Sequence, residues 1–531
     1  MHDMMSCLVI PFLLLKFIQV GFCIEPRFSL SSDISYPSAD QKVLFLTNSD
    51  HEQSNAFLAT CQSLIQYPFV DVHFASFPEL RDEVSNLHTG LSRVRFHALN
   101  GTPYAKRLEL EEYRLSGLSH PPGFHGAVAS RKDLPISQVP WNGTEYLEMY
   151  RSMLDVIKAV DPTLVVIDPM LKQANDAVLQ LGYQYMILSA SNLRDVLVTE
   201  QPAGKMIREF PAIGSGFSSP LPWYLAPCNA YLWLRRAFTM VFSSHLRKLK
   251  SCRQHHGVAN PVNLVEWYRD EVTVLVTSSL EIEYPMFVPP NVIACGPIIP
   301  LVPSIVRRDQ CWQDCLKCWH DSSQPILLID LQRLTKDDTI EIVRTLFYIL
   351  LEYDDLQVLW NIKNQTEDSR TDDIHLVVDT FSSISYCRTR KLQLNMAGIA
   401  SLLTSEAISC VLHRGETGLF HDALTSGVPQ LLLPKWQRDY DYAVQAEWLG
   451  VGKWANRDHA PFIANGELTD AIRSVLDQER DGVHIAQQAK QISSVLQTDP
   501  GQNRAAQEIL KTLRLPNNRT KERWRASSDE L

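Results

Sequence analysis

Short apolar runs alternate with stretches of helical periodicity along the first part of the chain. Strands are predicted for the apolar runs that end in polar or turn residues, at 42–50, 70–77, 163–168 and 184–190. Helices are predicted where apolar residues recur every three or four positions, at 55–67, 146–160 and 174–182. Because strands that alternate with helices pair in parallel, this pattern favours a doubly wound sheet.

The same alternation begins again after a proline-rich stretch at 285–303. Here the predicted strands are 325–331, 356–362, 407–413 and 429–434, and the predicted helices are 338–353, 418–427, 442–450, 468–478 and much of 480–513. The predicted fold class is therefore α/β, with two facing, doubly wound, Rossmann-like domains built on parallel sheets. In such folds the carboxyl ends of both sheets are directed at one shared site.

The length of the chain supports two domains, since a single core stops growing at roughly 250–300 residues and the chain has 531. We expect an apolar segment at 1–24, a polar linker at 25–40, a first domain at 41–303, a second domain at 304–495, a C-terminal helix at 496–515 that packs back across the domains, and a tail at 516–531. The stretch 223–241 is rich in Trp, Tyr and Arg. It either lines a substrate pocket of the first domain or consists of ordinary packing residues.

Charge and cysteine content exclude two classes of protein. The net charge is −10 and the pI about 5.9, with no stripe of Lys and Arg, so no nucleic-acid partner is expected. The 11 cysteines are scattered and odd in number, which is not a disulfide framework. Cys311, Cys315 and Cys318 form one cluster. It either carries structural thiols on a helix, which we favour, or binds zinc or an iron–sulfur cluster.

Both ends of the chain bear on its location. Residues 7–24 are apolar, but their uninterrupted core is too short to span a bilayer. The last four residues, Ser-Asp-Glu-Leu, resemble the tails that receptors retrieve to the endoplasmic reticulum. Glycosylation triplets occur at Asn100, Asn142, Asn364 and Asn518. Two locations stay open: the endoplasmic reticulum, with a signal or a peripheral membrane contact at the N-terminus, and the cytoplasm.

The turn at 413–418 carries the most chemistry. A predicted strand ends at His413, and Gly415 and Gly418 let the backbone approach a ligand closely. The first turn of the helix that follows offers unpaired N–H groups and a partial positive charge. With the His413 side chain as an added donor, the turn is suited to an anion such as a diphosphate, although many similar turns bind nothing.

The span 411–457 resembles the donor-binding signature of UDP-glycosyltransferase-like enzymes that use nucleotide sugars, and it is most similar to their fungal small-molecule branch. Matching positions are His413, Gly415, Ala423, Leu424, Gly427, Val428, Pro429, Pro434, Trp436, Tyr440, Asp441, Ala443, Leu449, Gly450, Val451, Gly452, Trp454 and Asn456. Weaker similarity extends over roughly 42–515. The resemblance implies a GT-B fold, with an acceptor-binding first domain and a second domain that binds the nucleotide sugar.

The resemblance also implies roles for individual residues. His51 falls on the position of the catalytic base, and Asp168 falls on the carboxylate that orients it. Donor-binding roles are implied for Ser278, His413, Gly415, Thr417, Gly418, Trp436, Arg438 and Asp439. The nucleotide sugar is a co-substrate, and no metal or other cofactor is expected, because the helix start at 415–418 would stabilise the leaving diphosphate.

The implied function is inverting transfer of a sugar, with a UDP-sugar as the first expectation for the donor. The expected acceptor is a hydroxyl group of a lipophilic small molecule such as a secondary metabolite. His51 would remove the acceptor proton, and Asp168 would raise the basicity of its imidazole. The alternative is a catalytically silent homologue that binds a ligand or serves as a scaffold.

Several donor positions depart from the family pattern, and these departures motivate the alternative. In the segment 413–439, Glu416 replaces a glycine. The glutamate that holds the ribose is replaced by His421 or is shifted to Asp422, and the aspartate that binds the sugar is replaced by Arg438, with Asp439 adjacent. The family's Asn-Leu-Gly-Ser/Thr segment reads Asp-Leu-Gln-Arg at 330–333, and the base-stacking tryptophan is missing from 394–396. The donor site is therefore either rebuilt for another nucleotide or sugar, or lost.

Overall fold

The computed structural model describes most of the chain. The described residues are 41–89, 92–109, 119–258, 271–299, 324–331, 334–362, 377–382, 388–394, 396–477 and 481–514. Several predicted features lie outside these ranges: the segments 1–24 and 25–40, the domain boundary at 303, the cysteine cluster at 311–318, the triplets at Asn364 and Asn518, and the C-terminal tail.

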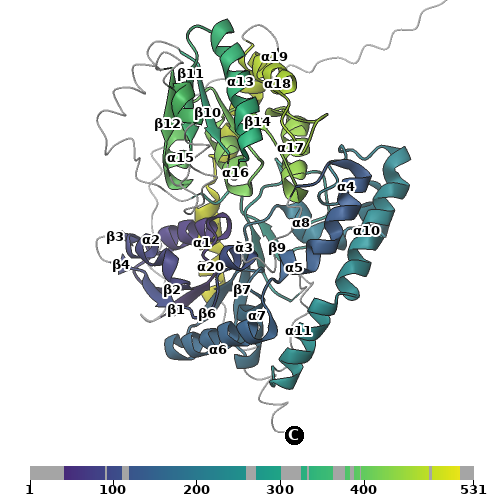
Figure 1. Ribbon diagram of the computed structural model, residues 1–531. Coiled ribbons are helices and arrows are strands. Elements are labelled where there is room, and N and C mark those ends of the chain that lie inside the picture. The colour runs from purple at the N-terminus through teal and green to yellow at the C-terminus, as the bar shows by residue number, and fades with distance from the viewer. Residues whose placement is uncertain are drawn as a thin grey trace, which may run out of the picture. The chain divides into compact units, whose positions relative to one another are not determined.

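The first sheet has seven parallel strands in the order β5-β2-β1-β6-β7-β8-β9 (Figure 1). They are β1 (Gln41–Leu46), β2 (Val70–Ser76), β5 (Arg95–Ala98), β6 (Leu164–Ile167), β7 (Tyr185–Ser189), β8 (Val274–Val276) and β9 (Val292–Ala294). The central strand β1 is covered on both faces, since Leu44 and Leu46 join one apolar cluster and Val43 and Phe45 join another. Burial on both faces requires the continuous apolar run that the sequence has there.

Helices and one small hairpin connect these strands. Before residue 139 they are α1 (His51–Leu64), η1 (Pro78–Leu80), α2 (Arg81–Ser85), the antiparallel pair β3 (His88–Thr89) and β4 (Ser92–Arg93), α3 (Tyr104–Glu109), α4 (Gly123–Ser130), η3 (Arg131–Asp133) and α5 (Leu134–Gln138). Then follow α6 (Gly143–Val160), α7 (Lys172–Leu181), α8 (Leu193–Leu197), η4 (Val198–Glu200), η5 (Pro202–Gly204), α9 (Lys205–Arg208), η6 (Trp223–Leu225), α10 (Ala226–Val241) and α11 (Ser244–His255). Helix α6 begins with a capping box in which the side chains of Asn142 and Glu145 each accept the other's backbone N–H. The side-chain amide oxygen of Asn142, which lies in one of the predicted glycosylation triplets, therefore caps helix α6.

The second sheet has six parallel strands in the order β12-β11-β10-β13-β14-β15. They are β10 (Ile326–Asp330), β11 (Gln357–Asn361), β12 (Thr389–Leu392), β13 (Cys410–His413), β14 (Gln430–Leu432) and β15 (Gly452–Trp454). The helices are α13 (Lys336–Glu352), α15 (Met396–Leu403), α16 (Thr417–Ser426), α17 (Gln437–Leu449), α18 (Asn465–Leu476), α19 (Asp481–Leu496) and α20 (Gly501–Arg514). The predicted α/β class with two doubly wound parallel sheets is confirmed.

Each sheet reverses its winding direction between two central strands, and these switch points locate the places where ligands bind in such folds. In the first sheet the reversal lies between β1 and β6, where Leu46 pairs with Ile167. In the second sheet it lies between β10 and β13, where Asp330 pairs with His413. The residues that follow these strand ends therefore include the predicted His51, Asp168 and the 413–418 turn.

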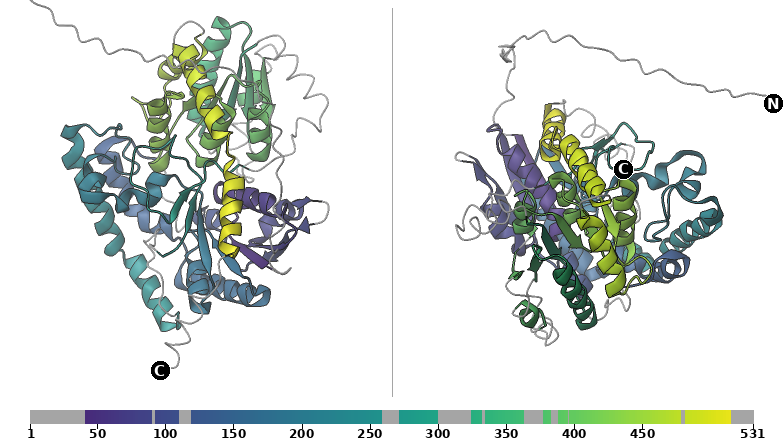
Figure 2. Two further views of the ribbon diagram at one scale, coloured as in Figure 1. Left: turned by 180° about the vertical axis from the view of Figure 1, so that it is seen from behind. Right: turned by 90° about the horizontal axis from the view of Figure 1, so that it is seen from above.

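The last described helix, α20, packs on the first sheet although it follows the second sheet in sequence (Figure 2). Five of its apolar residues join the cluster that also contains Val43 and Phe45 of β1: Ala505, Ala506, Ile509, Leu510 and Leu513. At its first residue, a Cβ on Gly501 would lie 2.5 Å from the carbonyl oxygens of both Gly296 and Pro297. Only glycine allows that close approach.

Candidate functional site

A small cavity is lined by residues that follow strands of both sheets. Its volume is about 20 Å³, and its lining consists of Gln53, Asp168, Pro169, Met170, Ala190, Ser191, Thr417 and Arg438. The first six belong to segments that follow β1, β6 and β7, whereas Thr417 and Arg438 lie in the first turns of α16 and α17. A volume of this size holds about one water molecule, so a sugar would enter only if the lining moved apart.

Asp168 is held by several hydrogen bonds at the end of β6. Its carboxylate accepts the Met170 N–H at 2.8 Å and the Thr47 hydroxyl at 3.3 Å, and its own N–H donates to the Leu46 carbonyl at 3.0 Å. Burial raises the pKa of Asp168 to about 6, although the Met170, Asn48 and Thr47 donors oppose that rise. The carboxyl group therefore changes charge close to neutral pH.

The predicted base His51 is the first residue of α1, which follows β1 after a short turn. The backbone turn is closed by the Asp50 carbonyl, which accepts the N–H groups of Gln53 and Ser54 at 3.0 and 2.8 Å. Gln53, two residues after His51, lines the cavity that Asp168 also lines. The structure thus places the start of α1 and the end of β6 at the same cavity.

In the second sheet, the end of β13 and the start of α16 form a tight polar turn. The fully buried His413 accepts the Gly415 N–H through Nδ1 at 3.1 Å, and its Nε2 lies 3.0 Å from Oε1 of Gln430. Gly415 has φ +107°, and a Cβ there would lie 3.0 Å from the Asp439 carbonyl oxygen. The turn therefore needs glycine both for its backbone conformation and for the contact with α17.

The Glu416 carboxylate folds back onto this turn. It accepts the Arg414 N–H at 3.3 Å and lies 3.8 Å from Nδ1 of His413. Burial alone would raise the pKa of Glu416, but His413, its own N–H and Arg414 outweigh that effect and lower the pKa below its ordinary value. A carboxylate with a lowered pKa keeps its negative charge at neutral pH, and it does so directly before the first turn of α16.

His421 lies inside α16 rather than at a site edge. Its ring is buried next to Phe420 and Tyr442, with ring centroids 5.6 and 6.3 Å away. Burial lowers the pKa of His421 to about 4, so the imidazole is neutral at physiological pH. In the next position, burial raises the pKa of Asp422 to about 7.

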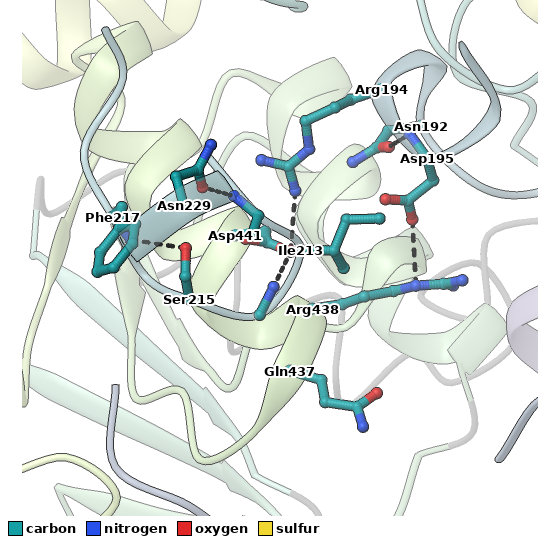
Figure 3. A network of polar contacts seen from close by, with 12 residues as sticks. Asn192, Arg194, Asp195, Ile213, Ser215, Phe217, Asn229, Gln437, Arg438 and Asp441 are labelled. Carbon is teal, nitrogen blue, oxygen red and sulfur yellow. Dashed lines mark hydrogen bonds and ion pairs between the residues drawn. The ribbon is translucent and has the colours of Figure 1, made fainter. Parts of the chain in front are cut away.

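Ion pairs join the start of α17 to α8, which follows β7 of the first sheet (Figure 3). The Arg194 guanidinium lies 2.9 Å from the Asp441 carboxylate, and both side chains are only 3% exposed. Nε of Arg438 lies 3.1 Å from the Asp195 carboxylate. The same Asp441 oxygen that pairs with Arg194 also accepts the Gly214 N–H at 2.9 Å. Arg438 therefore lines the cavity and also belongs to a network of ion pairs that links α17 of the second sheet to α8 of the first.

Backbone contacts tighten the same junction. The Gln437 N–H donates to Nε2 of His120 at 2.9 Å, and the His120 N–H donates to the Lys435 carbonyl at 3.0 Å. A Cβ on Gly214 would lie 2.9 Å from Cα of Gln437. Gln437 itself has φ 32°, which is rare for a residue with a side chain. The first turn of α17 thus has little freedom to move relative to the 120 and 214 loops.

The remaining predicted donor residues occupy different surroundings. Ser278 is fully buried after β8, and its hydroxyl donates to Glu283 at 2.7 Å. Trp436 precedes α17 and is half-buried, Asp439 lies in the first turn of α17 against Gly415, and Gly418 is the second residue of α16. Among the predicted set, the structure brings Asp168, Thr417 and Arg438 to one cavity. Their donor and catalytic roles stay predictions.

Sequence reasoning missed several residues of this site, including Gln53 and Asp195. Gln53 lines the cavity, and Asp195 pairs with Arg438. Neither was singled out by a motif, although Gln53 is two residues after the predicted base His51 and Asp195 immediately follows the buried Arg194. The lining of the cavity identifies Gln53, and the ion pair between α8 and α17 identifies Asp195.

The stretch 223–241 divides its large side chains between an apolar cluster and the surface. Trp223 is 86% exposed and Phe238 is 57% exposed, whereas Leu232 and Trp233 are buried in an apolar cluster with Phe210. The buried half of α10 is thus ordinary packing, and the other half faces solvent.

Two further properties concern the described residues alone. No group of three or more His, Cys, Asp or Glu side chains in them is arranged to hold a metal ion. Within the same ranges, no helix combines the length and the apolar character that crossing a bilayer requires.

Comparison with known proteins bears on the family. No protein-family model matches the chain. Glycosyltransferase sdnJ of Sordaria araneosa is 28% identical over 465 residues, which are 83% of this chain and 89% of that protein. Erythritol-mannosyl-transferase 1 of Mycosarcoma maydis is 26% identical over 172 residues, 32% of this chain and 27% of that protein.

Solved structures share the fold over nearly the whole chain. A UDP-glucosyltransferase from Polygonum tinctorium, capable of glucosylating indoxyl, has a TM-score of 0.59 at 16% identity and covers 90% of this chain and 100% of its own. Phytolacca americana UGT2, complexed with UDP-2fluoro-glucose and pterostilbene, has a TM-score of 0.55 at 12% identity, with 90% and 100% covered. The chain is a glycosyltransferase with the GT-B fold. In this glycosyltransferase the cavity lies where the carboxyl ends of the two sheets meet, as the fold leads one to expect.

Proposed function

We propose that this glycosyltransferase moves a sugar, with inversion, from a nucleotide diphosphate to a hydroxyl group of a lipophilic small molecule. The observation that carries the proposal is the cavity shared by Asp168, Thr417 and Arg438. It supports a reaction in which one sheet supplies the base and the other holds the donor. The solved structure of Phytolacca americana UGT2 is a complex with UDP-2fluoro-glucose and pterostilbene. This supports a UDP-sugar and a hydroxylated secondary metabolite as the first pair to test.

The proposed chemistry begins with the acceptor hydroxyl, which is a weak nucleophile until its proton is removed. His51 takes that proton while the oxygen's electron pair attacks the anomeric carbon from the face opposite the leaving group. The bond from that carbon to the diphosphate oxygen breaks, and its electron pair stays on the diphosphate. Asp168 stabilises the resulting imidazolium and keeps the ring in the correct tautomer.

Negative charge grows on the diphosphate as it leaves, and the start of α16 is suited to receive it. The N–H groups of the first helical turn have no acceptor within the helix, and the helix dipole adds a partial positive charge. Arg438 adds a full positive charge at the cavity wall, although Asp195 neutralises part of it. No step of this scheme requires a metal ion.

The activity test uses purified full-length protein with UDP-, GDP- and dTDP-sugars and a panel of hydrophobic alcohols. We expect product with the wild-type protein and a loss of at least about 100-fold in His51→Ala and Asp168→Asn, which is the usual scale for a general base. His484→Ala, at an exposed position on α19, is the matched control. Product formation that survives in His51→Ala would contradict the mechanism.

A second candidate function is supported by Glu416. Its carboxylate occupies the turn at which a diphosphate would bind, which favours a catalytically silent protein that binds another ligand. Calorimetry with UDP, GDP and dTDP tests this candidate. Micromolar binding that is abolished by Gly415→Val would count against it, since valine does not fit at φ +107° beside Asp439.

A further inference from the structure

An apolar stripe of exposed side chains runs along the outer face of α10. Trp223, Tyr224, Tyr231, Leu234, Phe238, Val241 and Phe242 are between 45% and 86% exposed. Counted at about 100° per residue, the five positions from Tyr231 to the C-cap residue Phe242 fall within roughly 100° of the helix circumference, which makes one continuous face. Trp223 and Tyr224 belong to η6, which directly precedes the helix. Figures 1 and 2 show α10 and α11 with no other described helix or strand on their outer side.

The stripe is fixed in place by the opposite face of the helix. Leu232, Trp233 and Met240 are at most 5% exposed, and the first two belong to the apolar cluster around Phe210. Asn229 ties the helix to the preceding loop, because its side chain accepts the Ala212 N–H at 2.6 Å and donates to two carbonyl groups at 2.8 Å. Rotating α10 to hide the stripe would break this packing, so the apolar face stays outward.

The charge of this region is opposite to that of the chain. The segment 210–265 contains no Asp or Glu, whereas the whole chain has 60 acidic and 50 basic residues. Its basic residues include Arg235 on α10 and Arg247, Lys248 and Lys250 on α11, all four of which are exposed. A stripe of Trp, Tyr, Phe and Leu beside exposed Arg and Lys is the composition of helices that lie in a membrane interface.

We propose that the face formed by α10 and the exposed basic residues of α11 docks on an anionic lipid surface. The helix lies in the plane of the interface with its apolar stripe among the acyl chains, and Arg235, Arg247, Lys248 and Lys250 contact lipid headgroups. The absence of acidic residues within 210–265 favours this occupant, because each basic side chain near an anionic leaflet strengthens binding about fivefold and the segment itself carries no carboxylate to offset that gain.

A second copy of the chain is a poorer occupant. A two-fold contact through the same face would bring the basic residues of the two copies together, and like charges at an interface oppose association. The membrane contact proposed here also differs from one through the N-terminal segment, since it is built from described helices of the first sheet's segment.

Vesicle co-sedimentation of the full-length protein tests the proposal without any sugar donor, so its outcome is separate from that of the activity assay. The probes are phosphatidylcholine vesicles with and without about 30% phosphatidylserine. We expect binding to the anionic vesicles that weakens at least tenfold when salt rises from 50 to 500 mM, because surface charges are screened. Equal binding to both kinds of vesicle, or none to either, overturns the proposal.

Two pairs of substitutions test whether vesicle binding depends on the α10 stripe or on exposed apolar side chains in general. In Leu234→Ser/Phe238→Ser, the altered residues are 67% and 57% exposed; in the control Leu351→Ser/Phe347→Ser on α13, they are 65% and 49% exposed. The control pair lies near the acidic residues Glu352, Asp354 and Asp355. We expect the first pair to weaken vesicle binding at least tenfold and the second pair to leave it within twofold.

A charge variant and a size measurement complete the test. Arg247→Gln/Lys248→Gln/Lys250→Gln should weaken binding to anionic vesicles about 100-fold, following from fivefold per charge. These positions are exposed, so thermal unfolding should match the wild type within about 2 °C. Full binding in the Leu234→Ser/Phe238→Ser variant overturns the proposal, as does a wild-type dimer that this variant converts to a monomer.

Discussion

Replacing Glu416 with glutamine should strengthen the binding of nucleoside diphosphates. The carboxylate accepts the Arg414 N–H and lies 3.8 Å from His413, at the turn that precedes the open N–H groups of α16. Because the pKa of Glu416 is lowered, the group stays charged and repels a phosphate bound there. Glutamine keeps the size of the side chain, and the extended backbone at this residue (φ −62°) requires no glycine.

The magnitude follows from two routes by which the protein can admit a diphosphate. If the carboxylate stays, two unit charges about 4 Å apart repel by about 4 kcal/mol at an effective dielectric constant of 20. If it swings into solvent, the cost is the loss of its charged hydrogen bond to Arg414, about 1.5–3 kcal/mol. The protein takes the cheaper route, so the penalty lies between about 1.5 and 3 kcal/mol, which corresponds to about 10- to 150-fold in Kd.

Isothermal titration calorimetry with UDP, GDP and dTDP measures the effect directly. We expect the Kd of Glu416→Gln to fall at least tenfold for one or more of these ligands. The control is Glu209→Gln, which removes the same charge at an exposed site directly after α9. If glutamine at 416 leaves the Kd unchanged or raises it, the carboxylate is not a competitor for the diphosphate and the placement of the donor at this turn is wrong.

Two further predictions concern buried carboxylates. Burial raises the pKa of Asp168 to about 6. We therefore expect kcat/KM to fall as pH drops below about 6, because the protonated carboxyl group no longer stabilises an imidazolium on His51. A kcat/KM profile that stays flat from pH 7 to pH 5 would contradict this role of Asp168. The sign for stability is opposite, since a raised carboxyl pKa makes the folded state gain stability as pH falls from 6 toward 4. Asp441→Asn keeps an acceptor for the Gly214 N–H but leaves Arg194 buried without its nearest counter-charge. We expect the free energy of unfolding, measured in urea, to fall by about 3–5 kcal/mol. The double variant Arg194→Leu/Asp441→Leu is the matched control and should recover most of that loss. A loss below about 1 kcal/mol in Asp441→Asn would show that the ion pair does not stabilise the junction between α8 and α17.

The central strands were predictable because burial on both faces demands an uninterrupted apolar run. The runs at 163–168 and 325–331 correspond to β6 (Leu164–Ile167) and β10 (Ile326–Asp330). Edge strands were missed for the opposite physical reason. β12 has an exposed Arg390, β5 is half-exposed, and β15 is only three residues long, so none of them carries a strong apolar signal.

The chemistry at the strand ends was partly predictable. A glycine turn between a strand and a helix identifies the 413–418 site, because the backbone conformation requires glycine there. The direction of the Glu416 side chain and the pairing of Arg438 with Asp195 depend on tertiary contacts that leave no local pattern. The same limit applies to α10, where both faces are apolar and only the fold decides which one is covered.

The position of α20 sets the order in which the molecule can be completed on the ribosome. The first sheet is synthesised before the second, yet its cluster around Val43 and Phe45 includes residues up to Leu513. The nascent first half therefore leaves apolar surface uncovered until more than 200 further residues have been translated after β9 ends at Ala294. During that interval the exposed surface is a natural binding place for a chaperone, since uncovered apolar surface on a folding intermediate promotes aggregation.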